Sequence, residues 1–322
     1  MNPVASSARL GGGRHPLLQR PVEPDTKRRY DNAVSMFVIW RQQHNYRPFQ
    51  SFEQVDEVLN EYIHWCWRRK MSFSLAKSTV YGIKAKHPLF RVGLPLSTQA
   101  LKSWDKLCVK SSYAPMPKTL AYCVAIYMAV NNRLSMAIAT LVGFHTYCRA
   151  GELLRLTRGD VVMPQDSRMS FANCDMGIFL RDTKTGKNQY VSITDAPIAQ
   201  LLCLLCMCTS PGGRLFAFSN STWRRWIKKA CASMGVAHHF VVHSLRHGGT
   251  THDFISDVPL QRIQMRGRWK SYDSMLVYLQ QGRAVLIARS LPPHVSQAGR
   301  LFCRDLLAAF SLAARCASSS RH

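Results

Sequence analysis

The sequence is poor in acidic residues, and this shortage already narrows the range of partners. It has 18 Asp and Glu residues against 43 Lys and Arg, which gives a formal net charge of +25 over 322 residues. Such an excess favours a polyanionic partner, and nucleic acid is the first expectation. Both halves of the chain carry the excess, so we expect both to contact phosphate.

Long apolar runs are also missing. The longest are Leu120–Val130 and Leu201–Cys208, whereas a helix needs about 20 apolar residues to cross a bilayer. We therefore expect no membrane partner. With 47% hydrophobic residues the chain can still bury sizeable cores, and its length fits two domains better than one.

The eleven cysteines do not form the spaced pairs of a disulfide framework. Their odd count and apolar surroundings indicate reduced core thiols and an intracellular, reducing compartment. One cluster with two nearby histidines could suggest zinc (Cys203, Cys206, Cys208, His238 and His239). Because these cysteines fall inside an apolar run, we favour a buried helix and predict no metal and no small-molecule cofactor.

Composition divides the first third of the chain into three segments. Residues 1–24, basic and broken by Gly11-Gly12-Gly13, predict a disordered arm, with an organelle transit peptide as the alternative. Residues 25–110 contain four amphipathic helical patterns and predict a compact, basic helical domain. Residues 111–118 are polar, charged and rich in proline, as expected of a linker that crosses DNA.

Residues 119–290 are predicted to form a second domain in which a strand pair follows apolar helices. Gly177–Asp182 and Gln189–Ile193 alternate apolar and polar residues on either side of a turn, which indicates a β-hairpin with Lys184 at its tip. A last helical pattern of this domain covers Asp273–Gln281. Residues 291–322 are a C-terminal tail with an amphipathic helix at Arg300–Arg315. The expected fold class is mainly α with a small β-hairpin or sheet.

Six residues with phosphate chemistry stand in order in the second half of the sequence. They are Arg149 in C-R-A-G-E-L-L, Lys184 in T-K-T-G, His243 and Arg246 in H-S-L-R-H, Trp269 in G-R-W, and Tyr278 in L-V-Y-L. Two guanidinium groups on different elements can bind the non-bridging oxygens of a phosphodiester, whose charge grows toward the transition state. Positive surroundings also help a phenol, with an ordinary pKa of about 10, to attack phosphorus.

The other three residue types fit the same reaction. His243 lies one helical turn before Arg246, which places an imidazole beside the same phosphate as an acid/base or orienting group. Lys184 is the candidate general acid for the departing 5′-oxygen. Trp269 can only donate one indole N–H, so it would support the phosphate.

In this order and spacing the motifs resemble the tyrosine recombinases, or phage integrases, over residues 25–285. That family has an Arg in R-x-G-E-L, a Lys on a β-hairpin, H-x-L-R, a His or Trp after a Gly, and a Tyr nine residues later. Trp269 and Tyr278 are nine residues apart here. The tryptophan resembles the Trp-containing subset of the family, and the resemblance implies a mobile element as the source.

The resemblance implies an N-terminal helical, SAM-like DNA-binding domain and a tyrosine recombinase catalytic domain. It implies double-stranded DNA as the partner, a homo-tetramer on paired DNA sites, and cleavage and rejoining through a 3′-phosphotyrosyl intermediate without metal or ATP. It also implies an intracellular location with the DNA, in the nucleus or the nucleoid. The tail at 291–322 either folds onto its own core or is exchanged between protomers.

Several alternatives stay open at this point. A type IB topoisomerase uses similar residues as a monomer, and a catalytically retired descendant of a mobile element would only bind DNA. The interval from Arg149 to Lys184 is longer than in many relatives, which leaves Lys187 as a second candidate acid. Tyr272 follows Trp269 by only three residues, so Tyr278 is the preferred nucleophile. Glu152 is expected to orient Arg149, and His247, Lys187 and Arg268 are expected near the site or on DNA.

Overall fold

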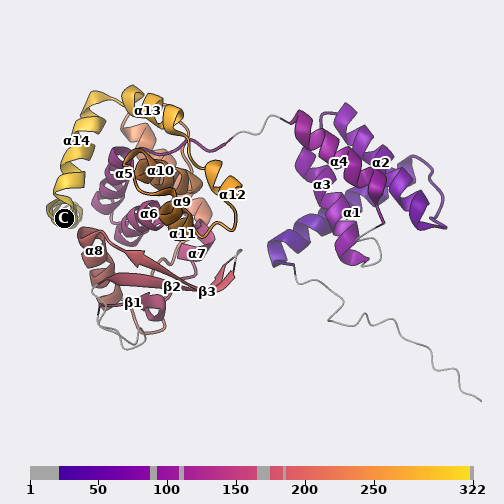
Figure 1. Cartoon of the computed structure of the whole chain (residues 1–322). Coiled ribbons are helices and arrows are strands. Elements are labelled where there is room, and N and C mark those ends of the chain that lie inside the picture. Colours follow the sequence, from indigo (N-terminus) through magenta and orange to yellow (C-terminus); the bar gives the residue numbers. More distant parts are fainter. Residues whose placement is uncertain (1–21, 88–92, 109–111, 165–174, 184–185, 320–322) are drawn as a thin grey trace, which may run out of the picture. The chain divides into compact units, whose positions relative to one another are not determined.

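The chain divides into two compact units, the first ending at residue 111 and the second beginning at Ser112 (Figure 1). The computed structural model describes residues 22–87, 93–108, 112–164, 175–183 and 186–319. Most of the predicted basic arm, residues 1–21, therefore lies outside the described residues. Each unit has its own hydrophobic core.

Unit 1 contains the four predicted helices, α1 (Pro24–Gln43), α2 (Phe52–Arg68), α3 (Phe73–Lys86) and α4 (Pro95–Leu107). Their inner faces bury aromatic and aliphatic side chains, among them Trp40, Leu59 and Tyr62. The Asp56 carboxylate of α2, itself buried, accepts hydrogen bonds from the backbone N–H groups of Leu96 (2.7 Å) and Ser97 (2.9 Å). A side chain of α2 thus satisfies the free donors at the start of α4 and holds the two helices together.

Unit 2 is built around two almost wholly buried helices, α5 (Lys118–Val130) and α6 (Leu134–Thr146). The side chains of both helices are apolar on all sides, so other elements of unit 2 pack against every face of them. The remaining helices are α7 (Ala150–Leu153), α8 (Ala196–Met207), α9 (Asn220–Ser233), α10 (Val242–Ile255), α11 (Leu260–Gly267), α12 (Tyr272–Leu276), α13 (Gln281–Ser290), α14 (Pro293–Arg304) and α15 (Leu306–Ser319).

A small antiparallel sheet lies at the edge of unit 2, beside α8 (Figure 1). Its strands β1 (Val161–Val162), β2 (Met176–Thr183) and β3 (Gly186–Ile193) are adjacent in that order. Met176 pairs with Ile193 and Thr183 with Gly186, so β2 and β3 form the predicted hairpin. The predicted fold class, mainly α with a small sheet, is confirmed.

Helix α10 approaches its neighbours more closely than any side chain would permit. A Cβ atom added at Gly248 would lie 2.1 Å from the carbonyl oxygen of Met116, and one at Gly249 would lie 1.9 Å from that of Phe144. The backbone N–H of Met116 also donates to the Ser244 carbonyl at 3.1 Å. Met116, within the predicted linker, thus packs directly on the helix that carries two of the predicted site residues.

The prediction of one helix over Asp273–Gln281 was wrong. Helix α12 ends at Leu276 and α13 begins at Gln281, so Tyr278 lies in the turn between them. The buried Thr251 hydroxyl of α10 donates to the Tyr278 carbonyl (2.8 Å) and accepts from the Gln280 N–H (3.3 Å). These are backbone groups that a continuing helix would use itself, which explains the break.

The prediction of a single helix at Arg300–Arg315 was also wrong. The chain bends at Asp305, between α14 and α15. Both helices pack against α5 of their own chain. Gly299 makes this possible for α14, since an added Cβ would lie 2.6 Å from the Thr119 carbonyl oxygen. At the start of α7, Glu152 accepts a hydrogen bond from the backbone N–H of Arg149 (2.8 Å).

Candidate active site

Five of the six predicted site residues meet beside α10. Helix α10 supplies His243 and Arg246, while the other three come from turns at the ends of α7, α11 and α12 (Arg149, Trp269 and Tyr278). The sixth, Lys184, lies outside the described residues.

Arg246 is the most buried of the five, with 1% of its surface exposed. Its guanidinium donates to the carbonyl oxygens of Gly267 (2.7 Å) and Tyr147, and lies 4.3 Å from the Trp269 ring centroid and 5.1 Å from that of Tyr278. Burial and the charge of Arg149 lower its pKa to about 10, so it remains charged at neutral pH. Within the part of the chain that is described, its buried Nε has no hydrogen-bond partner.

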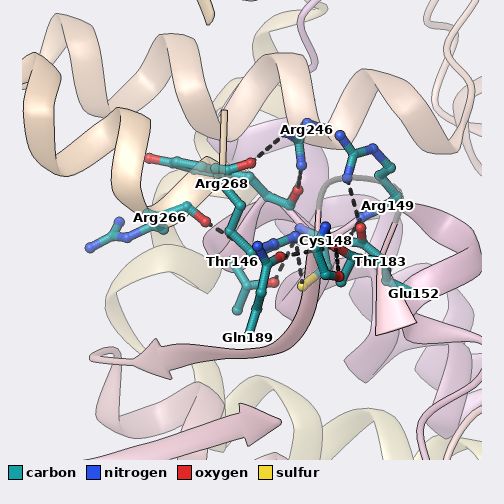
Figure 2. A network of polar contacts seen from close by, with 12 residues as sticks. Thr146, Cys148, Arg149, Glu152, Thr183, Gln189, Arg246, Arg266 and Arg268 are labelled. Carbon is teal, nitrogen blue, oxygen red and sulfur yellow. Dashed lines mark hydrogen bonds and ion pairs between the residues drawn. The ribbon is translucent and has the colours of Figure 1, made fainter. Parts of the chain in front are cut away.

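Glu152 joins two further arginines to this centre, as Figure 2 shows. Its Oε1 accepts from Arg149 Nη1 (2.8 Å), and its Oε2 accepts from Arg268 Nη2 (2.7 Å). Glu152 and Arg268 are almost fully buried, whereas the Arg149 side chain is 25% exposed. The expectation that Glu152 orients Arg149 fits these contacts, and Arg268 is a third guanidinium inside the site.

The charges of this group do not cancel. Burial alone would raise the pKa of Glu152, but Arg268, the Arg149 backbone N–H and the Arg149 guanidinium outweigh it, so the pKa is lowered and the carboxylate stays ionised. Three guanidinium groups therefore face one carboxylate, leaving two positive charges unbalanced among these four residues. A partly buried excess of this kind attracts an anion.

His243 lies near Arg246, Arg149 and Tyr278. Its ring centroid lies 5.7 Å from that of Tyr278 and 5.2 Å from that of His247. Burial, then the charges of Arg246 and Arg149, lower its pKa to about 4. The imidazole is therefore neutral at physiological pH and can accept a proton.

Tyr278 is half-buried, and its ring is held between two others. It stacks on His247, with centroids 4.4 Å apart and planes at 29°, and its centroid lies 4.9 Å from that of Trp269. Tyr272, the rival nucleophile, is 45% exposed at the first position of α12. Of the two, only Tyr278 has rings and the Arg246 guanidinium packed around it in the described residues.

Trp269 lies flat on the backbone at the end of α11. A Cβ added at Gly267 would come within 1.5 Å of the indole ring, so only glycine leaves room for it. Arg268 has the left-handed backbone conformation (φ 54°) and turns the chain between Gly267 and Trp269. The buried indole Nε1 donates to no atom of the described chain. It is a second N–H, with Arg246 Nε, that an added ligand oxygen could accept from.

Three residues that the sequence did not indicate, Tyr147, Asp253 and Arg266, form a chain of polar contacts that ends at Arg246. Tyr147 is left-handed (φ 53°), and its carbonyl accepts from Arg246. Its hydroxyl donates to the Asp253 carboxylate, which also accepts from Arg266 Nη1 (2.5 Å). Tyr147 precedes the Cys148-Arg149 motif, but no spacing rule links it to Asp253, more than a hundred residues later.

The hairpin that carries Lys184 is joined to the same polar network. Figure 2 includes Thr183 and Gln189 with Arg149, Glu152 and Arg268. Thr183, the residue before Lys184, donates its hydroxyl hydrogen to the Gly186 carbonyl (2.8 Å). Lys187, the second candidate acid, is exposed on β3 opposite Asp182.

Two further observations concern what the described residues do not contain. No group of three or more His, Cys, Asp or Glu side chains is placed to hold a metal ion in these parts of the chain. Among the helices described, none is long and apolar enough to span a bilayer.

Comparison with known proteins places the fold. No protein-family model and no curated protein matches the sequence. A lambda integrase dimer bound to a COC′ core site matches with a TM-score of 0.54 and 15% identity, over 82% of this chain and 92% of that chain. The Tn1549 transposon integrase in complex with circular intermediate DNA gives 0.53 and 15%, over 82% and 94%. The XerH site-specific recombinase bound to difH substrate gives 0.50 and 16%, over 82% and 78%.

Proposed function

We propose that this chain, which has the fold of the tyrosine recombinases, cleaves and rejoins double-stranded DNA through a 3′-phosphotyrosyl intermediate on Tyr278. One observation carries the proposal: the Tyr278 ring packs against Arg246, which belongs to a cluster of guanidinium groups with spare positive charge and with N–H donors that have no partner in the described chain. Such a cluster suits the phosphodiester, an anion whose charge increases as the nucleophile adds.

The phosphate would be held by N–H groups that have no hydrogen-bond partner in the described chain. Arg149 keeps Nη2 and Nε beyond its contact with Glu152, and Arg246 Nε and Trp269 Nε1 are buried donors without a partner in the described chain. Because these groups are already fixed by Glu152, Gly267 and Tyr147, little reorganisation is needed when charge develops. The arginines bind the non-bridging oxygens, and Trp269 adds one neutral donor.

The chemical step exchanges one ester for another. The Tyr278 oxygen bonds to phosphorus as the bond from phosphorus to the 5′-oxygen breaks. Neutral His243, whose ring lies 5.7 Å from that of Tyr278, accepts the phenol proton. Lys184 donates a proton to the departing 5′-oxygen, with Lys187 as the alternative donor. The reverse steps rejoin the strand, and no external energy is required.

The surface of unit 2 supports DNA as the substrate. Helix α9 presents four exposed cationic side chains (Arg224, Arg225, Lys228 and Lys229). Arg133 and Lys229 lie over its Trp226 ring, 5.3 Å and 4.8 Å from the centroid. Cations around an aromatic ring suit a phosphate backbone. We propose site-specific recombination or integration by a homo-tetramer on paired DNA sites, inside the cell where the DNA is.

Covalent trapping tests the proposal. The protein is incubated with nicked duplexes taken from the DNA that flanks its own gene, and a protease-sensitive shifted band is sought on a denaturing gel. We expect the band from wild type and from Tyr272→Phe, and none from Tyr278→Phe. A band that survives in Tyr278→Phe and disappears in Tyr272→Phe would overturn the site, and tight DNA binding without any band would overturn the activity.

A further inference from the structure

Gln280, two residues after Tyr278, is the centre of a hydrogen-bond network that the reaction above does not use. Its Nε2 lies 2.8 Å from His247 Nδ1, 2.8 Å from Ser112 Oγ and 3.1 Å from the Tyr113 carbonyl oxygen. Its Oε1 accepts from Arg283 Nη1 at 3.1 Å, and the same guanidinium nitrogen donates to the Ser112 carbonyl at 2.7 Å. One amide thus joins α10, α13 and the first residues of unit 2.

The partners of this amide fix its orientation. Arg283 can only donate, so the atom facing it must be the amide oxygen, and the Tyr113 carbonyl can only accept, so the atom facing it must be the amide nitrogen. The nitrogen has two hydrogens for three facing atoms and cannot accept, so His247 Nδ1 at 2.8 Å must be the unprotonated ring nitrogen. Burial, followed by the charges of His243, Arg246 and Arg283, lowers the pKa of His247 to about 3. His247 is thus neutral, with its proton on Nε2.

His247 is the ring that lies flat on Tyr278. Its centroid is 4.4 Å from that of the phenol, which is the shortest of the ring contacts that Tyr278 makes in the described residues. A hydrogen bond to a ring nitrogen fixes the rotation of a histidine about its Cβ–Cγ bond, and here the Gln280 amide supplies that bond. The position of the phenol against the arginines therefore depends on Gln280 through His247.

The other end of the network is the start of unit 2. Ser112 is its first residue and continues directly into the chain of unit 1, and Tyr113 places its ring 5.2 Å from His243 and 6.2 Å from His247. Tyr113 is 53% exposed, so its ring is held by few neighbours. A displacement of this segment would remove two partners of the Gln280 amide and one ring beside His243.

We propose that Gln280 is a positioning residue that locks His247 against Tyr278 and makes this lock depend on the connecting segment at Ser112–Tyr113. The inference rests on the proposed function, in which Tyr278 is the nucleophile. It adds a means by which the first residues of unit 2 position the nucleophile. Gln280 itself touches neither the phosphate nor the reacting atoms.

The first test needs no DNA. In protein labelled with ¹⁵N-histidine, we expect the His247 resonances, assigned by their loss in His247→Gln, to report a neutral ring protonated on Nε2. In Gln280→Glu a carboxylate replaces the amide and accepts from Nδ1, so Nδ1 should become protonated. A wild-type ring protonated on Nδ1, or a His247 spectrum identical in Gln280→Glu, would overturn the lock.

The second test separates positioning from binding. At saturating nicked DNA we expect Gln280→Ala to form the covalent complex about tenfold more slowly, as loss of one buried hydrogen bond implies. Its dissociation constant for DNA should stay within about twofold of wild type. Ser112→Ala, which removes one of the amide's partners, should slow the step by a few-fold at most, and Gln281→Ala, an exposed neighbour at the start of α13, should not slow it.

The outcomes distinguish this inference from the proposed function. An unchanged rate in Gln280→Ala, or the same slowing in Gln281→Ala, would overturn the positioning role while Tyr278 keeps its assignment. Weaker DNA binding with an unchanged rate would make Gln280 a DNA contact instead, and would also overturn it. A wild-type protein that forms no covalent complex would overturn the proposed function, while the histidine spectra would still decide whether Gln280 fixes His247.

Discussion

The arginine cluster (Arg149, Glu152, Arg246 and Arg268) and the tyrosine turn (residues 277–280) face each other across the site but are held by different forces. The cluster is buried and charged, with Glu152 ion-paired to two guanidiniums and Arg246 bonded to two carbonyls. The turn is partly exposed, with Val277 at 62%, and is held by the Thr251 hydroxyl and by ring contacts.

This difference separates two requirements of phosphoryl transfer. Binding a developing charge works best with dipoles and charges that do not move, and the cluster is fixed by contacts that are costly to break. A nucleophile that is exposed before the correct DNA is bound brings no benefit. The turn is held by contacts whose individual loss costs only about 1 kcal/mol. We therefore expect substitutions in the cluster to affect stability most and those around the turn to affect it less.

The largest expected effect is at Arg268. Arg268→Met leaves the Oε2 atom of Glu152, a buried carboxylate oxygen, without its guanidinium partner, and should lower the free energy of unfolding by about 3 kcal/mol. Urea denaturation measures it. Arg304→Met is the matched control, since its ion pair with Asp305 is largely exposed and should be worth less than about 1 kcal/mol. Equal losses in the two variants would remove the distinction between cluster and surface.

A smaller effect is expected at Thr251. Thr251→Val keeps the shape but removes the hydroxyl that bonds to the Tyr278 carbonyl and the Gln280 N–H, and should cost about 1–2 kcal/mol of stability. The covalent complex should also form more slowly, because the turn is freed. Thr250→Val, equally buried on the same helix, removes only a bond to the Arg246 carbonyl and should leave the rate closer to wild type. The comparison fails if Thr250→Val is the slower variant.

The effect that is smallest per step is a gradual dependence of stability on pH. Folding lowers the pKa of His243 from 6.5 to about 4 and that of His247 to about 3. As pH falls below about 6.5, the unfolded chain takes up protons that the folded chain refuses, so stability is present above this pH and is lost progressively on acidification toward pH 4. Each group contributes at most about 1.4 kcal/mol per pH unit.

The measurement is the free energy of unfolding of wild type and His247→Gln between pH 7 and pH 4.5. We expect a shallower slope in the variant, because one proton-binding difference is gone. His145 and His252, whose pKa values burial also lowers, contribute to both slopes, so only the difference between the slopes belongs to His247. Parallel slopes would mean that His247 is not the buried neutral ring described above.

The motif order predicted which residues meet, because each motif is a short local pattern on its own element. Residues such as His243 and Arg246 lie one helical turn apart whatever the tertiary fold, so their proximity follows from sequence. The hairpin around Thr183 and the four helices of unit 1 were predictable for the same reason, since alternation and helical periodicity are local signals.

Long-range contacts could not be predicted in this way. The break before Tyr278 depends on a hydroxyl from Thr251, and the Glu152–Arg268 ion pair joins residues more than a hundred positions apart. Local propensity favours a continuous helix across residues 273–281, and only the packed structure shows that α10 removes two of its backbone hydrogen bonds. Gln280 carries no motif at all, and its role follows from four partners that the chain brings together.

The close approach at Gly248 and Gly249 has a consequence for how copies of this gene would decay. Any side chain at either position would collide with a carbonyl oxygen of Met116 or Phe144 and push α10 outward, carrying His243, Arg246 and His247 with it. A duplicate could thus become inactive while every polar residue of the site remained intact. Intact polar residues alone therefore do not guarantee a working site in such a copy.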